Sequence, residues 1–184
     1  MKSSIQLHEG RPADEAGRLP REIRTYDYLD ELGIPFFRAD HAQASTMEDL
    51  READRVLGVR ICKNLFLCNR QKTNFYLLSM PADKPFKTKE LSGQLRISRL
   101  SFAEPEDLLR LLDIEPGAVS IMGLIYDREQ NVRLLMDEDL REKEYFGCHP
   151  CVSTTSIRLK MQDVLERYLP ATGHLPTWVT LRGE

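Results

Sequence analysis

The chain has 184 residues and a formal net charge of −3, from 26 Lys and Arg against 29 Asp and Glu. Its length favours one domain with a sizeable core, and its 41% of apolar residues together with 10 glycines exclude a disordered or collagen-like chain. No apolar run approaches the ~20 residues of a membrane span, and the N-terminal residues lack the apolar region of a secretory signal. We therefore expect a cytoplasmic protein with no membrane partner.

The first part of the chain contains two predicted helices and a strand. Residues 1–19 are charged and contain glycine and proline, which predicts a flexible leader ahead of a domain over residues 20–184. Apolar side chains recur at helical spacing from 20 to 32, and a proline is favoured in the first helical turn. A short strand at 34–41 and a helix at 47–57 are expected to follow.

The central and C-terminal parts mix hairpins with helices. Two apolar runs at 61–68 and 74–80, joined by polar residues, predict a hairpin of buried strands. The pattern then predicts helices at 88–95 and 104–113, strands at 117–127 and 131–137, at least one strand within 143–157, a helix at 161–170 and a strand at 178–181. Because helices and strands do not alternate strictly, this order favours a single α+β domain with a mixed, mostly antiparallel sheet over a doubly wound fold.

Basic residues are concentrated in one segment. Residues 58–100 contain nine Lys and Arg but only two acidic residues, so this segment carries +7 and the rest of the chain −10. Such an asymmetry indicates a basic patch that attracts phosphates. The alternative is that these side chains are scattered over several faces of the fold.

Lys63 is unusual because it lies inside an apolar run. With the two-residue period of a strand it shares a face with Ile61 and Leu65. Burying an ammonium group is costly unless it meets an anion, so a lysine here points to a partner carboxylate or a bound phosphate. The alternative is that Lys63 lies at the mouth of the strand and extends its ammonium into solvent.

Residues 148–151 read Cys-His-Pro-Cys, a spacing found in redox pairs and in halves of zinc sites. The residues that follow are β-branched, whereas a redox pair of the thioredoxin type begins a helix. The other cysteines, Cys62 and Cys68, are separated by five residues, which is wider than is usual for zinc. We therefore predict no metal and no cofactor, and buried cysteines that act as small apolar residues; a redox or zinc role is the alternative. His149 is either structural or a hydrogen-bond donor to a substrate.

Residues 116–120 read Pro-Gly-Ala-Val-Ser and lie between a predicted helix and a predicted strand. Small residues let a ligand approach the backbone, whose N–H groups can then donate hydrogen bonds. The same residues are also typical of a simple turn.

A set of motifs recurs in a characteristic order along the chain. It comprises residues 41–46, Lys-Asn-Leu-Phe-Leu at 63–67, the segment 116–120 leading into Met-Gly-Leu at 122–124, Gly-Cys-His-Pro-Cys at 147–151, Thr154 with Thr155, and Leu-Pro-Ala-Thr-Gly-His at 169–174. In this the chain resembles the YbaK/prolyl-tRNA synthetase-associated domain family, and most of all its ProX/PrdX-type branch, which hydrolyses mischarged aminoacyl-tRNA(Pro). The resemblance extends from about residue 26 to residue 181.

The resemblance implies a curled sheet flanked by helices and a set of site residues. Lys63 would be the essential catalytic lysine, placed against the phosphate and ribose of the 3′-terminal adenosine, with Asn64 assisting it. His149 would be the second catalytic residue, lining the same pocket. The residues that would bind the aminoacyl group are Thr46, Gly117, Ala118, Val119 and Ser120.

The resemblance also implies a reaction and its partners. A water would attack the ester carbonyl, organised by the terminal ribose hydroxyl and by backbone donors, so the protein supplies positioning and oxyanion stabilisation. The partners would be the acceptor end of tRNA(Pro) carrying a non-cognate amino acid and, transiently, prolyl-tRNA synthetase.

Two positions depart from the family pattern. Ile121 stands where many relatives have proline, and Ser153 where asparagine is expected. These departures bear on which amino acid is removed. Ala-tRNA(Pro) is the first expectation and Cys-tRNA(Pro) the second; the alternative function is a non-catalytic module that binds aminoacyl-tRNA or a proline-like ligand.

Overall fold

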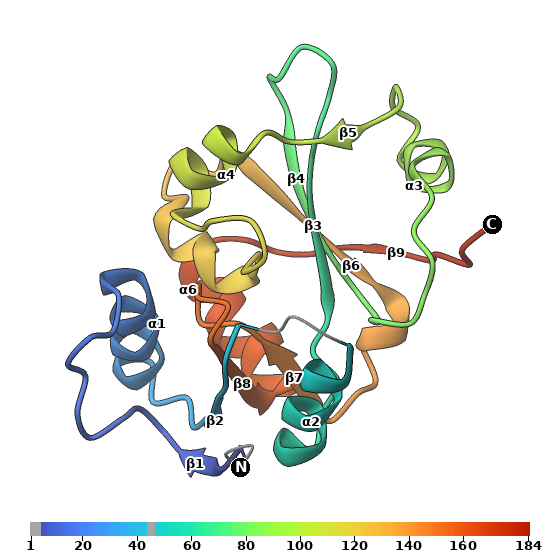
Figure 1. The fold of residues 1–184 in the computed structure, drawn as a ribbon. Helices are drawn as coiled ribbons and strands as arrows, with labels where there is room; N and C mark the ends of the chain where they lie inside the picture. Colours follow the sequence, from blue (N-terminus) through green and yellow to red (C-terminus); the bar gives the residue numbers. More distant parts are fainter. Residues whose placement is uncertain (1–4, 44–46) are drawn as a thin grey trace.

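The strands form two sheets in the computed structural model, which describes residues 5–43 and 47–184 (Figure 1). Sheet A is antiparallel throughout and has the order β1 (Leu7–Glu9), β2 (Phe37–Asp40), β8 (Thr155–Lys160) and β7 (Tyr145–Cys148). Sheet B is mixed and has the order β5 (Ser101–Phe102), β3 (Lys63–Cys68), β4 (Phe75–Met80), β6 (Val132–Asp137) and β9 (Thr177–Val179). In sheet B, β3 is antiparallel to β4 and β5, whereas β4, β6 and β9 run parallel.

The helices connect the strands and cover the sheets. They are α1 (Pro20–Glu31), α2 (Met47–Leu57), α3 (Thr88–Leu95), α4 (Pro105–Leu112), the 3₁₀ helices η1 (Ile121–Tyr126) and η2 (Glu138–Leu140), and a C-terminal helix made of α5 (Met161–Asp163), the π-helical η3 (Val164–Tyr168) and α6 (Leu169–Thr172). No helix of the described residues is long and apolar enough to cross a membrane.

Sheet B is buried on both faces, which explains why the β3–β4 hairpin is apolar throughout. Phe66 and Leu77 belong to the larger core, together with side chains from α1, α4, η1 and sheet A. Leu67 and Leu78, one residue further along each strand, belong to a smaller core with Leu91 of α3. Alternate residues of one hairpin therefore serve two cores.

The two sheets meet at a parallel bridge between Ile61 and Gly147. The backbone N–H of Cys62 donates to the carbonyl of Gly147 at 3.1 Å. A Cβ at position 147 would lie 2.9 Å from Val59 Cγ1, so glycine permits this close approach. Both segments run in the same direction from the bridge, and Lys63 and the residue at 149 follow it by two positions each.

The structure confirms the α+β domain with mixed, mostly antiparallel pairing, and the predicted helices at 20–32, 47–57, 88–95 and 104–113. The prediction of a strand at 117–127 was wrong, because residues 121–126 form η1. A single sheet was also predicted, whereas the strands divide into two sheets joined at the bridge.

The described part of the N-terminal segment packs on the domain. β1 pairs with β2 at the edge of sheet A. The backbone N–H of Gly10 donates to the carbonyl of Phe36 at 2.8 Å, and Arg11 forms an ion pair of 2.8 Å with Asp27 of α1. Backbone pairing and ion pairs thus join this segment to sheet A and α1.

Candidate functional site

Lys63 begins β3, opposite Met80 of β4, and its side chain is half-buried. Its ammonium donates to the backbone carbonyl of Lys84 at 2.6 Å. The sequence predicted a carboxylate or a phosphate as the partner of Lys63, or an ammonium that extends into solvent from the mouth of the strand. The observed partner is a carbonyl dipole, which orients the ammonium but, being neutral, does not cancel its charge.

Asn64 is held in place by two hydrogen bonds. Its amide nitrogen donates to the carbonyl of Cys62 at 3.1 Å, and its amide oxygen accepts from the hydroxyl of buried Ser79 at 2.5 Å. An Asn side chain has two amide protons, so one proton remains available for a ligand.

His149 follows β7 and is fixed by the first residues of β8. Its Nδ1 lies 2.8 Å from the carbonyl oxygen of Thr155. Since a carbonyl oxygen only accepts, Nδ1 carries the proton and Nε2 of the neutral ring carries a lone pair. Burial lowers the pKa of His149, so the ring is neutral at pH 7. His149 therefore presents an acceptor at Nε2.

A second histidine is coupled to His149. His41 donates from Nδ1 to the carbonyl of Ala42 at 2.9 Å and accepts at Nε2 from the hydroxyl of Ser156 at 2.8 Å. The same hydroxyl oxygen lies 3.4 Å from Nδ1 of His149, and the two imidazole centroids are 6.3 Å apart. Ser156 is fully buried, so this three-residue chain fixes the orientation of both rings.

The segment Gly117, Ala118, Val119 and Ser120 forms the turn that enters η1. Gly117 has φ +94°, a conformation that favours glycine. Ser120 is buried, and its hydroxyl accepts from the backbone N–H of Met122 at 3.1 Å. Ile121, the residue after Ser120, packs in the same core cluster as Cys148, the residue before His149.

The structure thus brings three separated motifs to the end of β7. The bridge at Gly147 brings in the segment that leads to Lys63, and Cys148 packs in one core cluster with Ile121, which follows Ser120. Cys148 is followed directly by His149. Thr46, the remaining predicted site residue, lies outside the described residues.

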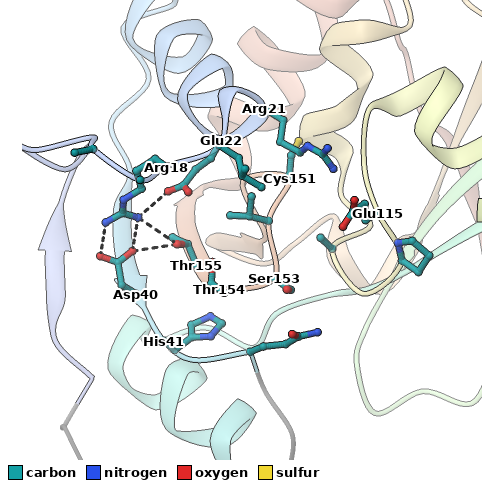
Figure 2. Close-up of a pocket in the computed structure, with 17 residues that line it drawn as sticks. Arg18, Arg21, Glu22, Asp40, His41, Glu115, Cys151, Ser153, Thr154 and Thr155 are labelled. Carbon is teal, nitrogen blue, oxygen red and sulfur yellow. Dashed lines mark hydrogen bonds and ion pairs between the residues drawn. The ribbon is translucent and has the colours of Figure 1, made fainter.

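A cavity of about 470 Å³ opens beside this junction (Figure 2). Its walls come from the start of α1, the end of β2, the loop before η1 and the turn before β8. The lining residues are Ala16, Gly17, Arg18, Leu19, Arg21, Glu22, Asp40, His41, Gln43, Glu115, Pro116, Ala118, Cys151, Val152, Ser153, Thr154 and Thr155. Since His41 is hydrogen-bonded to Ser156, the cavity is linked to the His149 side of the junction.

One wall of the cavity is an ion-pair network (Figure 2). Arg18 binds both carboxylate oxygens of Asp40, at 2.8 and 2.9 Å, and reaches Glu22 at 2.7 Å. Burial raises the pKa of Asp40, but the guanidinium groups of Arg18 and Arg38 outweigh it and hold the pKa well below its usual range. Sequence reasoning missed this wall, because Arg18 and Asp40 are 22 residues apart and no local pattern connects them.

The four cysteines are free thiols. Burial raises the pKa of Cys62 and of Cys151 to about 12, and that of Cys148 as well. The thiol of Cys151 accepts a hydrogen bond from the Thr25 hydroxyl at 3.6 Å. Among the described residues, no group of three or more His, Cys, Asp or Glu side chains is placed to hold a metal ion. These thiols are suited to packing, not to nucleophilic chemistry at neutral pH.

The basic segment 58–100 is distributed over the β3–β4 hairpin, the loop after it and α3, which lie apart in Figure 1. Lys84 is paired with Asp137 and Asp139, and Arg60 with Asp83. Asp137 and Asp139 lie outside the segment, so their pairing with Lys84 neutralises part of the predicted +7, in which Asp83 is already counted.

Comparison with known proteins identifies relatives of this chain. Residues 41–166 match the model of the aminoacyl-tRNA editing domain family. The chain is 30% identical to the prolyl-tRNA editing protein ProX of Acetoanaerobium sticklandii over 146 residues, which is 79% of this chain and 88% of that protein. It is 29% identical to prolyl-tRNA synthetase associated domain-containing protein 1 of Danio rerio, covering 82% of both chains.

A solved structure shares the fold. A crystal structure assigned to a candidate trans-editing enzyme for prolyl-tRNA synthetase superposes with a TM-score of 0.64 and 16% sequence identity. The superposition covers 89% of this chain and 98% of that one.

Proposed function

The chain belongs to the family of aminoacyl-tRNA editing domains, and we propose that it removes a non-cognate amino acid from tRNA(Pro) in trans, with Ala-tRNA(Pro) as its first substrate. Cytoplasmic translation would be its setting and prolyl-tRNA synthetase a transient partner. The observation that carries the proposal is the junction at the end of β7. There the segment leading to Lys63 is bridged to Gly147, two residues before His149, and Cys148 packs in one core cluster with Ile121, which follows Ser120. The ProX relative, named as a prolyl-tRNA editing protein, supports the choice of tRNA.

Lys63 supplies the positive charge in the proposed mechanism. After donating to the carbonyl of Lys84, its ammonium keeps two protons for the phosphate and ribose of the terminal adenosine. The free amide proton of Asn64 adds a neutral donor beside it. Together they place the ester at the turn formed by residues 117–120.

Hydrolysis then needs a positioned water and an oxyanion site. The water oxygen attacks the ester carbonyl carbon, helped by the terminal ribose hydroxyl. Backbone N–H groups of Gly117, Val119 and Ser120 stabilise the negative charge that develops on the carbonyl oxygen, since that of Ala118 donates to the carbonyl of Glu115 at 3.2 Å. The bond from that carbon to the ribose oxygen breaks, the ribose oxygen takes a proton, and free amino acid and tRNA leave. Nε2 of His149 accepts a hydrogen bond from the water or the ribose hydroxyl, which orients the attack.

The two departures from the family pattern have different structural meanings. Ile121 is fully buried, and its carbonyl accepts from the hydroxyl of Tyr168 at 2.7 Å, so its side chain serves the core. Ser153 lines the cavity. We therefore assign selectivity for small amino acids such as alanine, with cysteine second, to the cavity side that includes Ser153. Discrimination of one methylene is worth about 1–3 kcal/mol.

The test is a deacylation panel with Ala-, Cys- and Pro-tRNA(Pro). Wild type should cleave Ala-tRNA(Pro) fastest and spare Pro-tRNA(Pro). Lys63→Met should lower kcat by about 10²-fold or more, the usual cost of losing one charge-stabilising donor. Lys160→Met, which removes an exposed lysine at the end of β8, is the matched control and should retain activity.

Two results would overturn this proposal. Equal background rates for all three substrates would exclude editing. Tight binding of a charged-tRNA analogue without turnover would favour the alternative, a module that senses aminoacyl-tRNA or a proline-like ligand.

A further inference from the structure

Lys84 occupies an unusual position in the loop between β4 and α3. Its side chain is only 14% exposed, and its ammonium lies 2.7 Å from a carboxylate oxygen of Asp137 and 2.7 Å from one of Asp139. Asp137 ends β6, and its side chain is 1% exposed. The second oxygen of Asp137 accepts from the backbone N–H of Asp139 at 2.9 Å, so the two carboxylates are fixed relative to each other.

This cluster holds the loop firmly. Burial lowers the pKa of Lys84, but the hydrogen bonds from Asp137 and Asp139 outweigh it and raise the pKa above its ordinary value. A buried carboxylate such as that of Asp137 is costly without a cationic partner, so the ion pair persists in the folded chain. The backbone N–H of Lys84 also donates to the carbonyl of Pro81 at 3.2 Å, which closes a turn at this residue.

The carbonyl of the same residue receives the ammonium of Lys63 at 2.6 Å. The side chain of Lys84 is bound to the end of β6 and η2, while its backbone holds a side chain from β3. Lys63 is otherwise a flexible chain of four methylenes with three equivalent protons. Its orientation depends on where the loop places one carbonyl oxygen.

We propose that Lys84, Asp137 and Asp139 form a clamp that positions the ammonium of Lys63 for its ligand. They are positioning residues, because the ligand would contact Lys63 and not the clamp. The effect of the clamp on catalysis rests on the proposed function of Lys63. Its effect on the placement of the ammonium does not, and can be measured separately.

The first experiment measures deacylation by variants of the full chain. The double variant Lys84→Met with Asp137→Asn removes both charges, so that no buried carboxylate is left unpaired. We expect kcat to fall about 10- to 100-fold, the cost of misplacing a reacting group by about 1 Å, with KM within about threefold of wild type. Lys84→Arg keeps a cation between the carboxylates and should restore most of kcat.

Two further variants separate the clamp from general damage to the loop. Asp83→Asn removes the neighbouring exposed ion pair with Arg60, at 3.3 Å, and should leave kcat within about twofold of wild type. Asp139 is 66% exposed, so Asp139→Asn should fold even if the double variant does not. It should lower kcat by a smaller factor than the double variant, because Asp137 still holds Lys84.

The second experiment does not depend on turnover. Acylation of the Lys63 amine by an amine-reactive reagent, followed by mass spectrometry, should be several-fold faster in the double variant than in wild type and unchanged in Asp83→Asn. If wild type deacylates no form of tRNA(Pro), the proposed function fails, while this labelling still decides the clamp. A folded double variant with unchanged labelling of Lys63 and unchanged kcat would overturn the clamp. If the double variant does not fold, unchanged labelling of Lys63 in Asp139→Asn would overturn the clamp.

Discussion

The hydrogen-bonded pair formed by Asp127 and His174 lets us work out from the structure how much stability the loss of Asp127 should cost. Both residues are buried. Asp127 accepts from the ring of His174 at 2.9 Å, from the backbone N–H of Val132 at 2.8 Å and from that of Asn131 at 2.9 Å. Asp127→Ala leaves two buried donors unpaired, at about 2 kcal/mol each, and one exposed donor at about 0.5 kcal/mol. We expect a loss of about 4–5 kcal/mol in the free energy of unfolding, or about 10–15 °C in Tm.

The same pair predicts how the loss depends on pH. Burial raises the pKa of Asp127, but the hydrogen bonds from His174 and from the two backbone N–H groups outweigh it, so the pKa is lowered in the folded state. The stabilisation is therefore complete above the unfolded pKa of about 4 and is lost as pH falls through the folded value.

Urea denaturation followed by circular dichroism at pH 7, 5 and 3.5 measures both effects. The difference between wild type and Asp127→Ala should be largest at pH 7 and should shrink below pH 4. Asp127→Asn keeps one acceptor oxygen and should lose about half as much. A difference under 1 kcal/mol at pH 7, or one that does not change with pH, would refute the reasoning.

Three further predictions concern the site. Gly147→Ala places a Cβ within 3.1 Å of residues 59–61, so it should lower the free energy of unfolding by about 1–3 kcal/mol and also lower kcat. Gly93→Ala, whose Cβ would meet open space, is the control in thermal melts. The acidic limb of the pH–rate profile should lie below about pH 6.5, because burial lowers the pKa of His149 and protonation removes its acceptor. His149→Asn should abolish this limb, and a limb above pH 6.5 would contradict the assignment. Affinity for tRNA should fall about ten- to thirtyfold between 50 and 200 mM salt if a few basic residues of 58–100 contact phosphates, and a filter-binding series that shows no change would exclude such contacts.

The elements that the sequence predicted correctly are those whose signals are local. The helix at 20–31 has proline at its start and apolar residues at helical spacing, and the β3–β4 hairpin has two apolar runs around a polar turn. The strand predicted at 117–127 was wrong because the signal there was also only local. Its apolar residues form a continuous run, which fits a buried strand and a buried helix equally well, and the side-chain cap of Ser120 on Met122 decides for η1.

The candidate site was only partly predictable because most of its supports are non-local. The placement of Lys63 inside an apolar run marked it as exceptional, but nothing near it in sequence indicated that Lys84 would receive its ammonium. The tautomer of His149 likewise depends on the carbonyl of Thr155, which lies across a turn. Chemically notable residues are visible in a sequence, whereas the partners that orient them appear only when strands from distant segments meet.

The walls of the cavity come from two parts of the chain. The loop before η1 and the turn at 151–155 lie within residues 41–166, which match the family model. The opposite wall, with Arg18 and Asp40, is contributed by residues before 41 and depends on the N-terminal segment being packed on the domain. Thr155 joins the two groups, because its hydroxyl donates to Asp40 at 3.0 Å and lies 3.4 Å from the guanidinium of Arg18. The position of the first group, which includes Ser153, therefore depends on the packing of the second.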